Sequence, residues 1–260
     1  MIALDRYTLL ARVLPAAIVV TPAVAAGYAW IPLDFSVFKG VVALALLTAI
    51  AFALSFVPRD AGKRLEERLV SEWGGLPSTA VLRHRDTTFG CESKLRFHKR
   101  LVELGAVRRM PDKAEESNDP SASDTVYASA CTWLRSKTRD AKKFSLLFDE
   151  NIRYGFMRNL LGCKGCGVAV AVLAIFVDAV AFQQGRSVWI PVAISVATII
   201  YLVFFVTPGA LHRQAVTYAC RLVEAVDALE TGKKVTRASK ASQKTISAYE
   251  FVSLLFEFDF

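Results

Sequence analysis

The sequence has little of what several protein classes require. Its 14 Gly among 260 residues exclude a collagen-like repeat, and five Cys, an odd number, do not form the framework of a small disulfide-rich domain. There are only three His. Acidic residues are fewer than basic ones, 24 against 32, which gives a net charge of +8. Because 53% of the residues are apolar and 11% are aromatic, a fully disordered chain is excluded as well.

Long apolar runs are abundant. Each has about the 17 to 25 residues that a helix needs to cross a hydrocarbon core of about 30 Å. The runs form two pairs with short loops between their members, and they extend from Leu9 to Trp30, Phe38 to Val57, Gly167 to Phe182 and Val188 to Val206. We therefore expect a mainly α integral membrane protein with two transmembrane helical hairpins, four transmembrane helices in all.

The basic residues predict the orientation. Of the 32 Lys and Arg residues, only Lys39 and Arg186 fall in or beside the two short loops. Cytoplasmic segments carry the excess of positive charge in membrane proteins. We expect both termini and the polar middle of the chain in the cytoplasm of a bacterial cell, with the protein in the inner membrane.

This reading divides the chain into four parts. Residues 1–57 form the first hairpin, 58–164 an α-rich cytoplasmic domain with a stalk helix, 165–207 the second hairpin, and 208–260 a cytoplasmic amphipathic helix and an aromatic tail. Apolar residues at helical spacing predict the stalk up to Gly74. Further helices are expected from Ser78 or Thr79 through Leu82, from Glu92 to Leu104, from Asp124 to Arg139 and from Lys142 to Leu161, with an exposed loop from Met110 to Ser123.

An apolar seam follows the fourth run, at alternating spacings of four and three. Its members include Leu211, Ala215, Tyr218, Leu222 and Leu229. Two alternatives fit the pattern equally well: a helix packed on its own chain, or a helical bundle between subunits, since a 3.5-residue repeat favours self-association.

The C-terminal tail is rich in large apolar side chains, among them Phe251, Phe256, Phe258 and Phe260. Leaving such side chains in water costs about 1.5 to 3 kcal/mol each relative to burial. We expect them to dock on the chain's own domain or, alternatively, on a neighbouring subunit or partner protein.

No motif indicates an enzyme. His84-Arg85-Asp86 matches the start of a kinase catalytic loop, but the Gly-rich loop and the other kinase motifs are missing. Cys163 and Cys166 form a single CxxC without a second pair of zinc ligands. We expect neither catalysis nor a cofactor or metal.

Positive charge gathers in the polar middle, with aromatic and imidazole side chains in between. Such residues could grip phosphates and stack on bases of a nucleotide or oligonucleotide, although they could equally form a solvated face or touch anionic lipids. The candidates for an anionic ligand are Arg83, His84, Arg85, Arg96, His98, Lys99, Arg100, Arg135 and Arg139.

Asp178 is an acidic residue deep in an apolar run. A charge there costs about 2.5 to 3.5 kcal/mol on insertion scales, so it should face other helices or water. We consider Asp178, with Ser195 and Thr198 of the next run, to be pore candidates. The alternative is structural, with a protonated Asp178 hydrogen-bonded to Ser195 or Thr198.

Three blocks resemble membrane proteins of bacterial anti-phage operons, in particular the Hailong-type transmembrane effectors. They are Trp73 to Thr79, Leu82 to Asp86, and Lys143 to Leu161. The resemblance implies an oligomeric ion channel, controlled by nucleotide signals from a partner nucleotidyltransferase, whose opening depolarises the infected cell.

Two hypotheses follow. In the first, a homo-oligomer, for which we expect a tetramer, surrounds a pore that the cytoplasmic domain gates through the stalk and the segment from Asn151 to Leu161. In the second, a membrane scaffold recruits a cytoplasmic enzyme and conducts nothing. A membrane-bound hydrolase is a third, less favoured reading.

Overall fold

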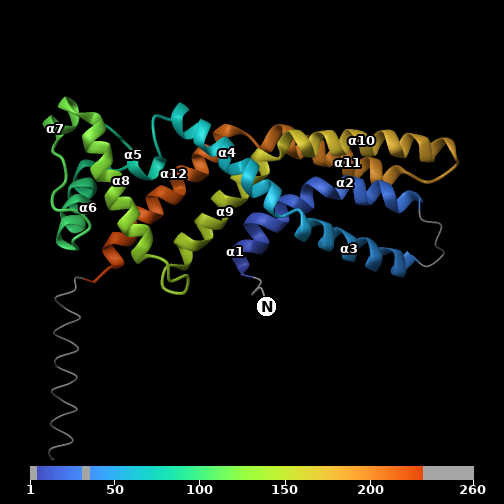
Figure 1. Ribbon diagram of the computed structural model, residues 1–260, viewed down its shortest axis with the longest axis horizontal. Helices are drawn as coiled ribbons and strands as arrows, with labels where there is room; N and C mark the ends of the chain where they lie inside the picture. Colours follow the sequence, from blue (N-terminus) through green and yellow to red (C-terminus); the bar gives the residue numbers. More distant parts are fainter. Residues whose placement is uncertain (1–4, 31–35, 231–260) are drawn as a thin grey trace, which may run out of the picture. The chain divides into compact units, whose positions relative to one another are not determined.

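The computed structural model describes residues 5–30 and 36–230, and within them the chain is helical and contains no strand. Figure 1 shows the arrangement of the helices. In chain order they are α1 (Arg6–Thr8), the π-helical η1 (Leu9–Val13), α2 (Leu14–Trp30), α3 (Ser36–Ala53), α4 (Phe56–Glu72), α5 (Pro77–Ala80), α6 (Cys91–Glu103), α7 (Lys113–Asn118), α8 (Pro120–Lys137), α9 (Ser145–Gly162), α10 (Lys164–Gln183), α11 (Trp189–Ile200), the π-helical η2 (Tyr201–Phe205), α12 (Pro208–Glu224) and the 3-10 helix η3 (Ala225–Ala228).

The chain forms two compact units. The first, the helical-bundle unit, comprises residues 1–78 and 141–221, and the second, the polar unit, comprises 79–140 and 222–260. These units do not coincide with the four parts drawn from hydropathy. The stalk α4 and the helix α9 pack with the apolar helices, whereas hydropathy alone separates apolar from polar segments.

All four apolar runs are mostly helical in their described parts, and a turn at Leu54 and Ser55 interrupts the second. Arg6–Trp30 and Lys164–Gln183 are each long and apolar enough to cross a membrane. The number rises to four if two bent helix pairs count as one span each: Gly40–Ala53 with Phe56–Ala80, bent by 45°, and Trp189–Phe205 with Pro208–Ala228, bent by 63°. Two to four helices can therefore span a bilayer.

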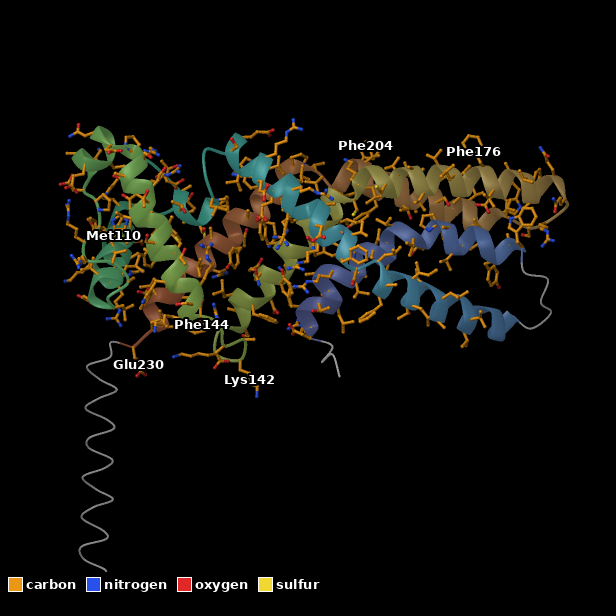
Figure 2. The ribbon with its side chains drawn as sticks, in the orientation of Figure 1. Met110, Lys142, Phe144, Phe176, Phe204 and Glu230 are labelled. Atoms are coloured by element: carbon orange, nitrogen blue, oxygen red, sulfur yellow. The ribbon has the colours of Figure 1, made fainter. Side chains whose placement is uncertain are left out.

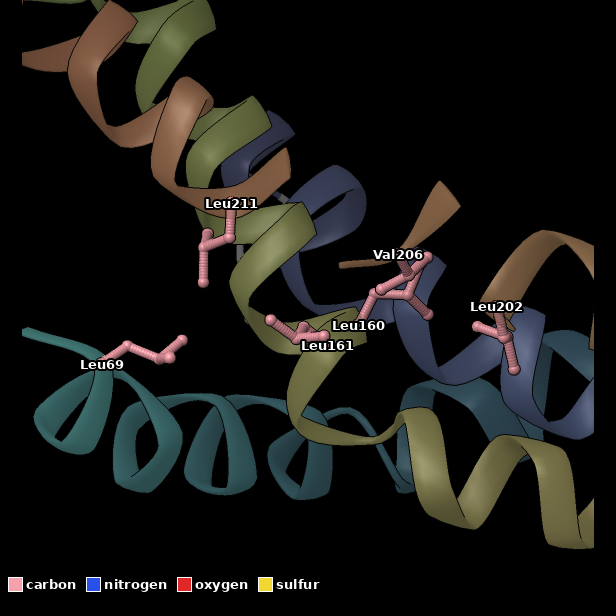
Figure 3. Packing of buried hydrophobic residues seen from close by; sticks show 6 residues of the cluster. All are labelled: Leu69, Leu160, Leu161, Leu202, Val206 and Leu211. Atoms are coloured by element: carbon pink, nitrogen blue, oxygen red, sulfur yellow. The ribbon is translucent and has the colours of Figure 1, made fainter. Parts of the chain in front are cut away.

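A core of aliphatic side chains joins the ends of these helices to the stalk. Figure 3 shows its buried members, which come from α4, α9, η2 and α12 and the residue after η2: Leu69, Leu160, Leu161, Leu202, Val206 and Leu211. Leu65 and Trp73 of the stalk segment pack against the same core. The stalk is thus bound to α9 and α12 along its apolar face and is not a free spacer.

The stalk ends where the sequence predicted. Gly74 and Gly75 have φ angles of +69° and +125°, which side chains rarely adopt. The amide of Gly75 donates to the carbonyl of Val70 at 2.9 Å, a hydrogen bond that closes the helix end.

The expected loop from Met110 to Ser123 is wrong, because α7 and the start of α8 occupy it. Asp112 accepts a hydrogen bond from the amide of Glu115, and Glu115 accepts one from the amide of Asp112, which is a capping box that starts α7. Pro120 lies in the first turn of α8, where its missing N–H costs nothing. Glu116 and Ser123 are buried, so the segment is part of the packed polar unit.

The other expected helices differ at their ends. The helix expected through Leu82 is shorter, since α5 ends at Ala80. The helix expected from Glu92 is α6, and Gly105 follows it with a φ of +75°. The two later helices are α8 and α9, and α9 is separated from α10 only by Cys163.

Candidate functional site

Asp178 lies in a seam of small residues on α10. The buried positions of this helix are Gly167, Ala171, Ala174, Asp178 and Ala181, spaced four, three, four and three apart. At the start of this seam α2 packs closely on α10, because a Cβ added at Gly167 would lie 4.0 Å from Cα of Val19. Asp178 is therefore an acidic residue in a seam whose other members are glycine or alanine.

Asp178 and Ser195 are both fully buried at 0% exposure. Among the described residues, the two carboxylate oxygens of Asp178 have no hydrogen-bond partner, and the hydroxyl of Ser195 has none either. Thr198 donates its hydroxyl to the carbonyl of Ile194 at 2.8 Å, within its own helix. The structure thus contains neither of the two hydrogen bonds considered for Asp178.

The register of the α10–α11 hairpin brings Asp178 and Ser195 to a similar depth. The rings of Phe182 and Trp189 are 6.2 Å apart, which sets the level of the two helices near the turn. Asp178 lies four residues from that level and Ser195 six. With a rise of about 1.5 Å per residue, the two residues differ by about 3 Å along the hairpin. Both face the interior of one protomer.

The basic residues at the two ends of α10 are engaged elsewhere. Lys164 Nζ donates to the carbonyls of Val203 and Val206 at 3.1 and 3.0 Å. Arg186 Nη1 donates to the carbonyl of Ala29 at 3.0 Å, and its guanidinium lies over the ring of Trp30. Each cation caps the carbonyl end of a neighbouring helix, so neither serves as a counterion of Asp178.

Outside the apolar helices, the polar unit contains all of the anionic-ligand candidates. Arg83 is buried and pairs with Asp124 in a two-pronged ion pair, Nε to Oδ1 at 2.8 Å and Nη2 to Oδ2 at 2.9 Å. Arg85 lies 3.6 Å from Glu116 and 3.8 Å from Asp124. Arg83 and Arg85 therefore bind carboxylates of their own chain.

Glu116 organises this block from the opposite side. It is 2% exposed and accepts hydrogen bonds from the amides of His84 and Arg85, at 2.7 and 3.2 Å, and from the hydroxyl of Tyr127 at 2.7 Å. Burial alone would raise the pKa of Glu116, but these hydrogen bonds and Arg85 outweigh it and the pKa is lowered. Burial and the Glu116 carboxylate raise the pKa of Tyr127 far above its ordinary value, so its hydroxyl remains a donor.

The two histidines of the set also bind the backbone. His98 Nε2 donates to the carbonyl of Leu82 at 2.8 Å, and His84 Nε2 donates to that of Pro111 at 3.0 Å. Burial is the largest cause that lowers the pKa of His98, and the nearby His84 and Lys94 add to it. His98 is thus a neutral donor in the core of the polar unit.

The remaining basic candidates are more exposed. Arg96 lies 3.3 Å from Asp227, Arg100 pairs with Glu103 and donates to the carbonyl of Leu229, and Arg135 donates to Thr132. Lys99 and Arg139 are exposed.

One concave surface of about 460 Å³ gathers some of the candidates. His84, His98 and Lys99 line it, but Glu103 and Asp112 do so too. The carboxylates offset its positive charge, so the structure does not gather the candidates into one strongly basic pocket.

The seam residues of α12 are buried in their own chain. Leu211, Ala215 and Leu222 are at most 4% exposed, and the ring of Tyr218 stacks on Tyr154 with centroids 6.1 Å apart. Leu229 follows η3 and is half-buried. This favours the first alternative, a helix packed on its own chain. The tail with Phe251, Phe256, Phe258 and Phe260 lies outside the described residues.

In the described part of the chain, no group of three or more His, Cys, Asp or Glu side chains could hold a metal ion. Of the CxxC pair, Cys163 is buried and Cys166 is exposed.

Sequence reasoning missed a set of polar contacts, centred on the buried Asn159, where α4, α9 and η1 meet. We call it the polar joint: the side chains of Glu66, Tyr154, Arg158 and Asn159 and the backbone carbonyl of Ala11. Two features of the sequence could have indicated it. Asn159 is a polar amide beside apolar residues at the end of α9, and Pro15 is a proline near the start of an apolar run.

Comparisons of this chain with protein-family models, with curated proteins and with solved structures found no match.

Proposed function

We propose that this protein is an oligomeric membrane channel, an effector that conducts ions when the part of the chain outside the bilayer signals it to open. The observation that carries the proposal is Asp178, a fully buried carboxylic acid in an apolar helix with no partner in the described chain. Ionisable groups at such positions are costly and mark ion or proton pathways in membrane proteins. Ser195, which is also unpartnered, lies at a similar depth.

The packing of α2 and α10 supports four crossings. Gly167 lies against Val19, and Arg186 binds the carbonyl of Ala29, so the two helices run parallel. If both cross the bilayer in one direction, the chain between them must cross back, and α3 is the apolar helix between them. The contacts that set the α10–α11 register make α11 antiparallel to α10. With the basic residues inside, both termini are cytoplasmic, in the inner membrane of a bacterium.

The proposal requires several copies. Asp178 and Ser195 face the inside of a closed bundle, and a bundle of four helices has no conducting path of its own. The outer surface is made of large apolar side chains, among them Leu173, Phe176 and Phe204 at 63%, 66% and 72% exposure. Figure 2 shows Phe176 and Phe204 on the edge of the molecule. Lipid or a second copy must cover them, and we propose a homo-oligomer, a tetramer by preference.

The signal is proposed to be a nucleotide made by a partner nucleotidyltransferase in anti-phage defence. This part rests on the resemblance of the three sequence blocks and on exposed basic residues such as Lys99 and Arg139. Arg83 and Arg85 contribute less than the sequence suggested, because they pair with Asp124 and Glu116.

The test is ion flux from vesicles of phosphatidylethanolamine and phosphatidylglycerol that contain the full-length protein, measured with and without each common nucleoside triphosphate. We expect Asp178→Ala to lower cation flux about tenfold or more and Ser195→Ala to lower it less. Thr198→Val is the matched control, because its hydroxyl binds only its own helix. An intact oligomer that conducts under no condition would contradict the proposal and favour the non-conducting scaffold.

A further inference from the structure

The first apolar helix has a defect that its own sequence explains. In an α-helix the carbonyl of Ala11 accepts a hydrogen bond from the residue four positions later, which is Pro15, and proline has no N–H. The chain is π-helical from Leu9 to Val13, immediately before this proline. Ala11 is fully buried, so its carbonyl cannot turn to water. A buried carbonyl needs a donor from another part of the chain.

Asn159 of α9 is that donor. Its Nδ2 lies 2.6 Å from the carbonyl oxygen of Ala11, and its side chain is completely buried. The amide thus takes the place of the N–H that Pro15 lacks, from a helix 148 residues further along the chain.

The oxygen of the same amide is bound by Arg158, the preceding residue of α9, and Arg158 is in turn bound by Glu66 of the stalk. Arg158 donates from Nε and Nη2 to Oδ1 of Asn159, both at 3.2 Å, and from Nη1 to Oε2 of Glu66 at 2.9 Å. Glu66 also accepts a hydrogen bond from the hydroxyl of Tyr154. Burial and the Glu66 carboxylate raise the pKa of Tyr154 well above its ordinary value, so the phenol stays a donor.

Glycines let the three helices approach closely enough for this chain of contacts. A Cβ at Gly62 of α4 would lie 2.7 Å from Oδ1 of Asn159, and one at Gly155 of α9 would lie 2.8 Å from the hydroxyl of Tyr7. A Cβ at Gly162 would lie 2.4 Å from the amide nitrogen of Gly62. The joint is therefore built on direct backbone contact and has little room to adjust.

We propose that the polar joint is a regulatory latch, in which Asn159 fixes the shape of the first apolar helix at Pro15 and thereby holds the closed arrangement of the bundle. α9 is the element that can release it, since it continues through Cys163 into α10 and binds α12 through Gln214 Nε2, which donates to Glu150 at 2.5 Å. A displacement of α9 pulls on the helix at Ala11 and moves α10 together with it. The latch rests on the proposed channel function only for its effect on conduction.

The first test measures the joint without any conduction. Amide hydrogen exchange is followed in residues 9–17 of the full-length protein in detergent. We expect Asn159→Ala to speed exchange there about tenfold, because a buried carbonyl loses its donor. Asn151→Ala, the same change eight residues earlier on α9, is the matched control and should leave it unchanged.

A second-site variant sharpens this test. Pro15→Ala restores an N–H four residues after Ala11, so Asn159→Ala should have a much smaller effect in the Pro15→Ala background. Unchanged exchange in Asn159→Ala, or an equal effect in both backgrounds, would overturn the latch. If Asn159→Ala alone does not fold, the double variant should fold, and its failure to do so would count against the latch equally.

The last test is basal flux in the vesicles described above. We expect Asn159→Ala to raise flux without added nucleotide about tenfold, and the double variant to return it toward the wild-type value. If Asn159→Ala speeds hydrogen exchange as expected but neither the wild type nor any variant conducts ions, the polar joint is supported and the channel function is contradicted. A conducting wild type whose basal flux does not respond to Asn159→Ala would overturn the latch and leave the channel.

Discussion

At the scale of single residues, the neighbours Glu115 and Glu116 differ in burial and in the groups that they bind. Glu116 is buried and accepts from two amides and a phenol, whereas Glu115 is exposed and serves the capping box and an ion pair with Arg109. We expect Glu116→Ala to speed amide exchange of His84 and Arg85 about 100-fold, near 3 kcal/mol, because two part-buried amides and the buried Tyr127 hydroxyl lose their acceptor. Glu115→Ala should destabilise α7 by about 1 kcal/mol.

Site-resolved hydrogen exchange on the full-length protein measures both changes. Equal effects of the two variants on the His84 and Arg85 amides would show that Glu116 does not hold the 83–86 segment.

His98 makes the polar unit sensitive to acid. Its pKa is lowered from the ordinary value of 6.5, with burial as the largest cause, so the folded unit favours neutral imidazole. Stability is therefore complete above about pH 6.5 and falls as the pH drops through the folded pKa. Glu116 has the same sign but acts only at lower pH, below its ordinary value of 4.5.

We expect His98→Gln to remove the loss of exchange protection in α6 between pH 6.5 and 5, since its amide can still donate to Leu82. A pH profile identical to that of the wild type would show that His98 does not titrate with unfolding.

The sequence could show which residues carry charge but not which of them are already paired. Arg83 and Arg85 looked available because their partners, Asp124 and Glu116, stand 41 and 31 positions away. Only the packing of α7 and α8 brings these carboxylates beside the arginines. Asp178, by contrast, stood out at once, because an isolated acid in an apolar run needs no knowledge of the fold.

At the scale of elements, apolar periodicity located most helices to within a few residues, since it reflects which face each helix buries. It missed α7, where Asp112 and Glu115 form a capping box in a stretch with few apolar residues. It also could not show how closely α4 and α9 pack, which depends on Gly62 meeting Gly162.

Gly162 and Gly165 offer a direct test of that packing. A Cβ at Gly162 would lie 2.4 Å from the backbone of Gly62, whereas one at Gly165 meets nothing within 4 Å. We expect Gly162→Ala to destabilise the protein by about 3 kcal/mol or more, as an overpacked contact does. Gly165→Ala should be neutral or stabilise by up to about 1 kcal/mol, because alanine favours a helix. Thermal unfolding in detergent compares the two, and equal midpoints would exclude close packing of α4 on α9.

At the scale of the whole molecule, the open question is how many times the chain crosses the bilayer. By length and composition, two helices can cross a membrane, and up to four can if each bent pair counts as one span. If both helices cross, the parallel course of α2 and α10 requires a return between them, and α3 is the apolar helix available for it. Without that return, and with the N-terminus inside, Cys91 would lie outside the cell and the turn at Gln184 inside, because α10 separates the two.

Cysteine labelling on intact cells separates the two topologies. Two variants are compared, and in both Cys166 and Cys220 are changed to Ser. The first keeps Cys91, and in the second Cys91 is also changed to Ser and Gln184→Cys is added. With four spans, a membrane-impermeant maleimide should label the cysteine at 184 at least tenfold faster than Cys91, and Cys91 should react only after permeabilisation. Equal labelling from outside would indicate that α10 does not cross. Labelling at Cys91 alone would contradict four spans with the predicted orientation: either α3 does not cross, or the orientation is the inverse of the one that the basic residues predict.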